Sequence, residues 1–400
     1  MENSCCKKTI AVATDVPFWN VSAGNEQRIS QVINFFRQSC DVIVLYIGYT
    51  SKKDQRKIAS YGLKNVYCAF EWKSILKDRV KLIVNTYFPA LRHILKKMRK
   101  PGSLNTRRSL VAKKKLRDIF SKTKVDVLCV EYVWLTYLFE DVSASVLKIV
   151  DTHDIQFDRC ESFRNVGLNY DFNISEEDEL KCLNLADVIL AINHRDCEIL
   201  SKKTNAKVVE YPYLPEKKDL EKRNQIECTP NRYRVAFIGS AIDFNIRALD
   251  WFCNKVWPYV KEMEPLSEFH VYGKVAVYAP SMSGVFAHGF VSNEKDIYYQ
   301  NDIFVNPILM GGGLKIKCVE ALMYAKPLVT TSVGAQGLET GIDKAFLVAE
   351  DETDFVDKLL LLLHDSKKKQ ELSSCSEQVV LFLKESLKKA EFSLAEKIGI

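Results

Sequence analysis

The sequence predicts an α/β fold of two halves, each built on a parallel β-sheet. Short apolar, β-branched runs alternate with amphipathic segments along both halves of the chain, which is typical of parallel strands joined by helices. A polar, proline-flanked segment at residues 214–232 interrupts this alternation and predicts a linker. The length of 400 residues also favours two domains, at roughly 100–200 residues per domain.

We therefore expect a first domain at residues 1–213, a second at 233–376 and a helical tail at 377–400, with a cleft between the domains. The expected strands of the first half are Thr9–Thr14, Asp41–Ile47, Asn65–Phe70, Val125–Val130, Leu147–Val150, Ala186–Ile192 and Lys207–Tyr211. Those of the second half are Arg234–Ile238, Glu268–Tyr272, Val285–Ala287, Ile303–Val305, Leu328–Val333 and Ala345–Val348. The expected helices include Glu26–Arg37, Ile246–Trp257, Asp354–Leu363 and Glu377–Lys389.

Composition excludes several classes of protein. With 47% hydrophobic and 27% charged residues the chain is typical of a globular protein, and no apolar run reaches the ~18 residues of a membrane span. The N-terminus lacks the pattern of a signal peptide. The 12 cysteines are scattered and show no zinc-site spacing, which favours reduced thiols. We expect a cytoplasmic protein.

The net charge of +6 is unevenly distributed. Residues 92–124 contain a single acid, Asp118, among many basic side chains, with apolar residues at helical spacing. This pattern predicts two short basic helices. It fits attraction to an anionic membrane surface, which would place the protein peripherally on the inner face of a membrane, and it fits a solvated helix face equally well. Nucleic acid is disfavoured because aromatic residues are not interleaved.

The stretch from Asn306 to Gly337 carries the strongest local signal. An apolar run ends in Gly311, Gly312 and Gly313, a helical segment follows, and Pro327 precedes a second β-branched run. This order predicts strand, glycine-rich turn, helix and strand. Glycines ahead of a helix allow close approach of a ligand, and the first helical N–H groups attract an anion. A plain flexible turn is the alternative interpretation.

The second half resembles the nucleotide-binding domain of group-1 glycosyltransferases. The segments that carry the resemblance are FIGSAIDFNIRALDWF, the strand ends VYGK and HGFV, DIFVNPILMGGGLKIKCVEAL and KPLVTTSVGAQGL. In the first half, SAGNEQR (Ser22–Arg28) and DTHD (Asp151–Asp154) resemble the family more weakly. The resemblance implies the GT-B architecture of two facing Rossmann-like domains, and a retaining transfer of a sugar from a nucleotide donor.

The resemblance also implies roles for individual residues of the second half. Glu320 would accept hydrogen bonds from the ribose hydroxyls, and Lys315 would stabilise the leaving diphosphate. Lys315 and Lys317 cannot share a face of a regular helix, so we expect Lys315, nearer the helix start, to reach the phosphate. The other residues expected to bind the donor are Gly239, Ser240, Arg247, Tyr272, Gly289, Phe290, Gly311, Gly312, Gly313, Leu314 and Lys317. We expect no catalytic role for His288.

The sequence departs from the family pattern at three positions. Gly312 stands where the family has the first glutamate of a pair, which leaves the donor sugar open. Ser240 and Asn245 stand where many relatives have a phosphate-binding Arg and Lys. Arg247 could supply charge if it points inward, whereas Asn245 is expected to cap a helix.

In the first half, the resemblance places His153 beside the transferred sugar and makes it a catalytic candidate. Gly24 and Asp154 would lie on the acceptor side, with Arg159 steadying the same loop or meeting the acceptor. Arg28 is interpreted as helix surface and receives no role. We expect no metal, because no Asp-x-Asp pair is convincing and Glu177–Glu179 lies in an acidic helical surface run.

We expect a nucleotide sugar as co-substrate, no other cofactor, and a glycan, glycolipid or glycoprotein as acceptor. Two other functions keep the same fold: a sugar-nucleotide epimerase or phosphorylase, and a non-catalytic sugar-nucleotide-binding or scaffold subunit. The base, the sugar, the linkage and the oligomeric state do not follow from these residues.

Overall fold

The computed structural model describes residues 7–21, 23–63, 65–69, 102–215, 233–291 and 293–400. The chain forms two compact units. The first comprises Met1–Ala191, Asp196–Glu210 and Ala390–Ile400, and the second comprises Ile192–Arg195 and Tyr211–Lys389. The predicted linker, from residue 216 onward, and the first of the two basic helices lie outside the described residues.

The first unit is built on a parallel sheet with the strand order β3-β2-β1-β4-β5-β6-β7. All six strand pairs are parallel. The strands are β1 (Thr9–Thr14), β2 (Asp41–Tyr46), β3 (Asn65–Cys68), β4 (Val127–Glu131), β5 (Leu147–Asp151), β6 (Val188–Ala191) and β7 (Lys207–Glu210). The order reverses between β1 and β4, which makes their carboxyl ends the expected ligand position.

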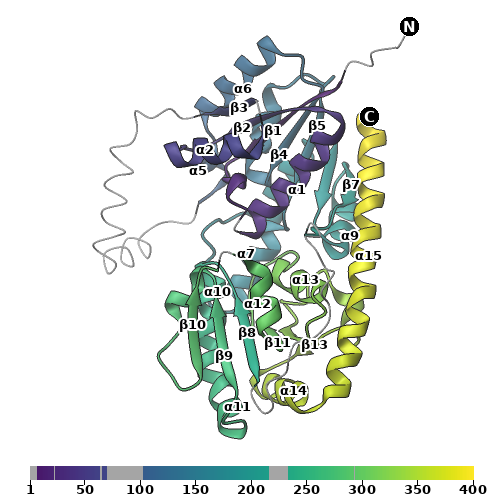
Figure 1. Ribbon diagram of the computed structural model, residues 1–400. Coiled ribbons are helices and arrows are strands. Elements are labelled where there is room, and N and C mark those ends of the chain that lie inside the picture. Colours follow the sequence, from purple (N-terminus) through teal and green to yellow (C-terminus); the bar gives the residue numbers. More distant parts are fainter. Residues whose placement is uncertain (1–6, 22, 64, 70–101, 216–232, 292) are drawn as a thin grey trace. The chain divides into compact units, whose positions relative to one another are not determined.

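Helices pack on this sheet and bury its central strands on both faces (Figure 1). They are α1 (Gly24–Ser39), α2 (Lys52–Tyr61), α5 (Leu104–Arg107), α6 (Leu110–Lys122), η3 (Val133–Asp141), α7 (Gln156–Asn165), α8 (Glu176–Leu183) and α9 (His194–Lys203). In α6, Leu116 and Ile119 are buried, which confirms the second predicted basic helix.

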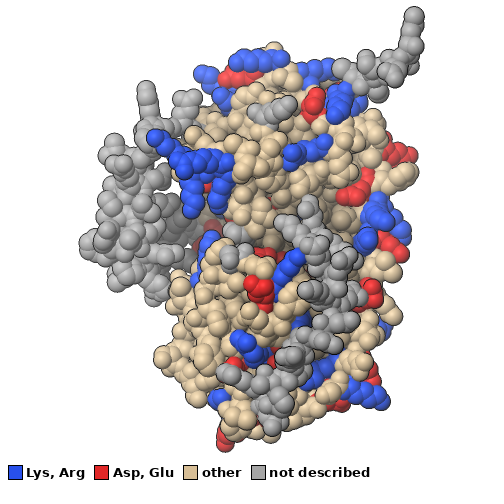
Figure 2. Space-filling model, viewed as in Figure 1, with Lys and Arg blue, Asp and Glu red and all other residues tan. Residues whose placement is uncertain are grey.

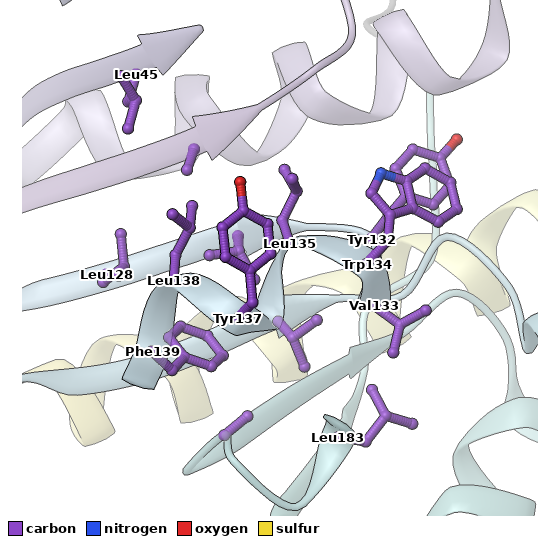
Figure 3. Packing of buried hydrophobic residues seen from close by; sticks show 14 of the residues in the cluster. Leu45, Leu128, Tyr132, Val133, Trp134, Leu135, Tyr137, Leu138, Phe139 and Leu183 are labelled. Atoms are coloured by element: carbon purple, nitrogen blue, oxygen red, sulfur yellow. The ribbon is translucent and has the colours of Figure 1, made fainter. Parts of the chain in front are cut away.

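The core of the first unit gathers around η3, whose residues Val133 to Phe139 are all buried. Figure 3 shows the rings of Tyr132 and Trp134 lying face to face beside Val133 and Leu135. The two ring centroids are 4.1 Å apart with an interplanar angle of 10°. Stacking and burial therefore fix the chain directly after β4, where the first candidate site residues lie.

The second unit repeats the plan with the strand order β10-β9-β8-β11-β12-β13, again parallel throughout. The strands are β8 (Arg234–Ile238), β9 (Glu268–Tyr272), β10 (Val285–Gly289), β11 (Ile303–Asn306), β12 (Leu328–Thr331) and β13 (Leu347–Ala349). The order reverses between β8 and β11. The predicted α/β class and parallel sheets are confirmed.

The helices of the second unit differ most from prediction at their ends. They are α10 (Asp243–Trp251), the π-turn η4 (Phe252–Val256), α11 (Trp257–Met263), η5 (Lys274–Tyr278), α12 (Glu294–Gln300), α13 (Ile316–Met323), η6 (Glu339–Gly341), α14 (Glu352–His364) and α15 (Ser366–Ile398). The predicted helix Ile246–Trp257 begins three residues earlier, and a wide turn interrupts it ahead of Pro258. The predicted helix Glu377–Lys389 is the middle of the much longer α15.

Gly273, which follows β9, has a backbone conformation that only glycine adopts readily, with φ 80° and ψ −172°. A Cβ atom there would lie 2.4 Å from the carbonyl oxygen of Gly239. The glycine thus lets the loop after β8 and the loop after β9 touch.

Gly273→Ala should lower the free energy of unfolding by about 2–4 kcal/mol, because it adds a backbone clash to conformational strain. Gly167→Ala is the matched control, since Gly167 also has positive φ (72°) but a Cβ there would meet nothing within 4 Å. It should cost only about 1 kcal/mol. Urea unfolding measures both, and an equal loss in the two variants would contradict the contact.

Candidate functional site

In the second unit, the loops after β8 and β11 flank the reversal of strand order, and a hydrogen bond joins the helices α10 and α13 that follow these loops. Lys317, in the first turn of α13, donates from Nζ to Oδ1 of Asn245 in α10 at 2.7 Å. The same ammonium lies 4.5 Å from the centroid of the Phe237 ring in β8. Burial lowers the pKa of Lys317 to about 7. Because burial disfavours the charged form, an anion beside Lys317 would stabilise its ammonium.

Asn245 holds the loop after β8 in place. The prediction that it caps a helix is wrong: α10 begins at Asp243 after Ile242, and Asn245 lies inside its first turn. Its amide nitrogen donates to the carbonyl and the hydroxyl oxygen of Ser240, at 2.9 and 3.2 Å. The side chain therefore bridges Ser240 and Lys317. Gly239 packs closely beside it: a Cβ at Gly239 would lie 3.1 Å from the Asn245 side chain, which would have to shift slightly.

Lys315 anchors the glycine-rich turn and also reaches Oε1 of Gln336 at 3.5 Å. Lys315 is buried, directly precedes α13, and donates from Nζ to the carbonyls of Gly312 and Gly313 at 3.0 and 2.8 Å. Gly311 and Gly313 have positive φ, and Leu314 is buried. The contacts of Lys315 give it a role in shaping the turn, whereas those of Lys317 connect the two loops.

Glu320 lies one turn after Lys317 on α13, and two residues three apart share a face of a helix. Its Oε2 accepts a hydrogen bond of 2.8 Å from the hydroxyl of Tyr298 in α12. Tyr298 is fully buried between the rings of Tyr324 and Phe304, at centroid distances of 4.4 and 4.7 Å. Burial beside the Glu320 carboxylate raises the pKa of Tyr298. The tyrosine orients the carboxylate, and no motif in the sequence indicated it.

The other residues expected to bind the donor are spread along the ends of β8–β10. Tyr272 is buried, accepts a hydrogen bond of 3.0 Å from Asn301, and stacks on His288 at 4.6 Å. Gly289 has φ 71° and Phe290 is 73% exposed, so the aromatic ring projects from this edge. Arg247 does not turn inward: it is exposed on α10 and pairs with Asp243 at 2.9 Å.

In the first unit, His153 belongs to a buried network at the ends of β4 and β5. His153 Nε2 lies 2.8 Å from Oε2 of Glu131, the last residue of β4. Asp151, the last residue of β5, binds the guanidinium of Arg28 from α1 at 2.7 and 2.9 Å. All four side chains are buried. Arg28 is thus no surface residue, and the interpretation of it as helix surface is wrong.

The backbone and a ring stack fix the orientation of His153. Its φ of 61° is rare for a residue other than glycine. Its ring stacks on Tyr132 at 4.0 Å and 10°, and Tyr132 stacks in turn on Trp134. Burial lowers the pKa of His153 to about 3, so its imidazole is neutral at physiological pH.

The neighbouring acidic residues support the loop around His153. Asp154 is buried and pairs with Arg159 at 2.5 Å. The surface interpretation is wrong for Glu179: it is buried and accepts hydrogen bonds of 2.9 and 2.7 Å from the backbone N–H groups of Gln156 and Phe157 at the start of α7. Burial raises the pKa of Glu179 to about 8. Gly24, at the start of α1, is partly buried.

The network at the ends of β4 and β5 contains side chains of the types that bind metal ions. Within the described part of the chain, Glu131, Asp151 and His153 are the one group whose ligand atoms all lie within 4.8 Å of one another. Arg28 already supplies a positive charge to Asp151, and Glu131 already meets the imidazole nitrogen that would bind an ion. The donor set therefore fits a hydrogen-bonded network better than a cation site.

The basic stretch is partly neutralised. Figure 2 shows Lys and Arg side chains gathered over the part of the first unit where Figure 1 labels α2 and α5, of which only α5 belongs to the basic stretch. Arg108 pairs with Glu140, Arg117 with Asp141, and Lys113 with both acids. Beside them, Leu110 and Val111 at the start of α6 are 85% and 48% exposed. No described helix is long and apolar enough to cross a membrane.

Comparison with known proteins places these features in context. Residues 232–365 match the family described as glycosyl transferases group 1. An uncharacterized 44.6 kDa protein in the cps region of Klebsiella pneumoniae is 24% identical over 88% of this chain and 90% of its own length.

Several solved structures share the fold across almost the whole chain. The pneumococcal O-GlcNAc transferase GtfA, solved with UDP and GlcNAc, gives a TM-score of 0.67 at 11% identity, covering 98% of this chain and 99% of its own. TarM of S. aureus gives 0.66 at 12% identity, covering 96% and 99%. The lipopolysaccharide outer core galactosyltransferase WaaB gives 0.59 at 13% identity, also covering 96% and 99%.

Proposed function

Because residues 232–365 match the family described as glycosyl transferases group 1, we propose that this chain transfers a sugar from a nucleoside diphosphate donor to an acceptor hydroxyl. The observation that carries the proposal is the position of Lys317, whose ammonium joins α13 to α10, the helices that follow β11 and β8 at the reversal of strand order. Ligands of such sheets bind at that position. Many relatives have a phosphate-binding Arg and Lys at the positions of Ser240 and Asn245. In this chain, Lys317 of α13 would supply that positive charge instead.

The chemistry of Lys317, Glu320 and the glycine-rich turn suits a nucleoside diphosphate. Lys317 and the N–H groups of the turn would stabilise the negative charge that develops on the diphosphate as the anomeric bond breaks. Glu320 lies one helical turn further on, and its carboxylate, which only accepts hydrogen bonds, suits the two ribose hydroxyls. Because the structures of GtfA and TarM hold UDP, we infer a UDP-sugar as the donor.

We propose that the transfer retains the anomeric configuration and needs no divalent metal. Positive charge for the leaving group would come from Lys317, and hydrogen bonds from the turn and the start of α13. His153 would meet the transferred sugar as a neutral hydrogen-bonding group, because burial keeps its pKa far below neutral pH. An acceptor hydroxyl on a glycan, glycolipid or glycoprotein would attack from the side of the leaving phosphate, which would take the proton.

The exposed start of α6 supports a glycolipid acceptor on an anionic membrane surface. Leu110 and Val111 would enter the headgroup layer, and Lys114, exposed on the same helix, would lie near the phosphates. The ion pairs of Arg108, Lys113 and Arg117 with Glu140 and Asp141 reduce the charge available from the rest of the helix.

Lys317→Met should weaken UDP binding about 10–100-fold, because it removes a charged hydrogen bond worth about 1.5–3 kcal/mol. The free protein has lost most of the Lys317 proton at pH 8, since its pKa is about 7. Binding an anion raises that pKa, so UDP should bind with uptake of about one proton, and affinity should fall as pH rises above 7. Calorimetry in two buffers of different ionisation enthalpy measures the uptake.

Lys315→Met is the matched control for Lys317→Met, because both substitutions remove an ammonium near the start of α13, two residues apart. It should loosen the turn and lower stability while leaving the proton uptake in place. Uptake that persists in Lys317→Met and vanishes in Lys315→Met would assign the phosphate contact to Lys315.

Glu320→Ala should raise the Kd for UDP about 10–100-fold, since the ribose loses a charged acceptor. Tyr298→Phe keeps the carboxylate but removes the hydroxyl that orients it, so a loss of about 3–10-fold is expected. Glu262→Ala, an exposed position on α11, should leave the Kd unchanged. Unchanged binding in Glu320→Ala would contradict the ribose contact.

The double variant Leu110→Ser/Lys114→Gln should bind vesicles containing anionic lipid about 10–100-fold more weakly, from the loss of one apolar contact and one charge. Sedimentation with anionic and with zwitterionic vesicles measures this. Lys255→Gln, an exposed charge of the second unit, serves as control. If the wild-type protein sediments with neither kind of vesicle, the proposed membrane contact is wrong.

A further inference from the structure

We propose that Glu131 is a positioning residue for His153: it donates a proton to Nε2 and so keeps the imidazole as the neutral tautomer with hydrogen on Nδ1. The inference rests on the proposed function only in that His153 faces a ligand. The Glu131–His153 contact of 2.8 Å is present in the protein without a ligand.

The geometry leaves one nitrogen of His153 for a ligand. Nε2 meets Oε2 of Glu131, so Nδ1 is the nitrogen left for hydrogen bonding outside the network. A ring flip of His153 is hindered, because Tyr132 stacks on the face of the ring and the backbone at φ 61° fixes the direction of the side chain. Glu131 is itself the last residue of a central strand and is fully buried. The contact is therefore a constraint built into the sheet.

The surrounding charges decide where the proton lies. Asp151 and Arg28 form a buried ion pair that is neutral as a unit. Oε1 of Glu131 and Oδ2 of Asp151 are buried without a hydrogen-bond partner in the described structure. An ionised Glu131 would thus add an uncompensated buried negative charge beside Asp151, which is costly.

A protonated Glu131 avoids that charge. Burial and the negative charge of Asp151 raise the pKa of Glu131, with Arg28 opposing and Asp15 adding to the shift. Burial and the charges of Arg28 and Arg159 oppose protonation of His153, while Asp151 favours it. The proton therefore stays on the carboxyl group, which donates it to Nε2, and an imidazole that accepts at Nε2 carries its own hydrogen on Nδ1.

The consequence is a fixed, uncharged donor. His153 presents an N–H group to an oxygen of its ligand, and Glu131, already protonated, cannot take a proton from the acceptor. Glu131 thereby selects the hydrogen-bonding role of His153 without touching the ligand.

Nuclear magnetic resonance of the full chain labelled with ¹⁵N-histidine tests the proposal without substrate. Long-range ¹H–¹⁵N correlations distinguish the two neutral tautomers and the imidazolium, and His153→Gln identifies the signals of His153 by their loss. We expect the Nδ1–H pattern, unchanged from pH 8 to pH 5. The Nε2–H pattern, an imidazolium at pH 7, or a shift of these signals on addition of Zn²⁺ would each overturn the proposal.

Two substitutions of Glu131 separate positioning from packing. Glu131→Gln retains a donor, so it should keep the Nδ1–H pattern and turnover of a UDP-sugar within about threefold. Glu131→Leu has similar volume but no donor, so His153 should change tautomer and turnover should fall. Glu140→Gln, at the surface of the same unit, is the control. A Glu131→Leu variant that keeps the Nδ1–H pattern would contradict the role of Glu131, whereas the expected pattern with no turnover of any UDP-sugar would contradict the proposed function alone.

Discussion

Parallel strand pairing is the constraint on which both candidate sites depend. Every strand of each sheet runs parallel to its neighbours, so all the carboxyl ends of a sheet lie along one edge. In the second unit, this brings the loop after β8 beside the loop after β11, close enough for Lys317 to reach Asn245. In the first unit, it sets Glu131 at the end of β4 beside Asp151 at the end of β5.

The two units handle buried charge differently. In the first, Arg28 neutralises Asp151 within the network, and the remaining carboxyl group meets a neutral imidazole. In the second, the partly buried ammonium of Lys317 has an amide oxygen and an aromatic face as partners, and no carboxylate completes the pair in these contacts. A group held in this way gains most from a ligand that brings its own negative charge, whereas the first network gains most from staying neutral.

Much of the fold followed from the sequence, because apolar periodicity reports burial directly. β1, β8 and β9 have the predicted bounds, and the parallel class follows from their unbroken β-branched runs. What could not be predicted depends on contacts distant in the chain. Arg28 and Asp151 are 123 residues apart, and nothing near Arg28 distinguishes it from a surface arginine. Likewise, motif spacing placed Glu320 and the lysines on one helix, but only the contacts with Tyr298 and Asn245 separate their roles.

The helix α15 gives the chain an order of assembly that differs from its order in sequence. Residues Ser366–Lys389 belong to the second unit, but Ala390–Ile400 belong to the first, where Leu394 is fully buried and Ser393 accepts a hydrogen bond from Lys207. A ribosome therefore synthesises the whole second unit before it delivers the segment that completes the first. During translation, the surface of the first unit that Ala390–Ile400 cover therefore stays exposed until the second unit has been synthesised.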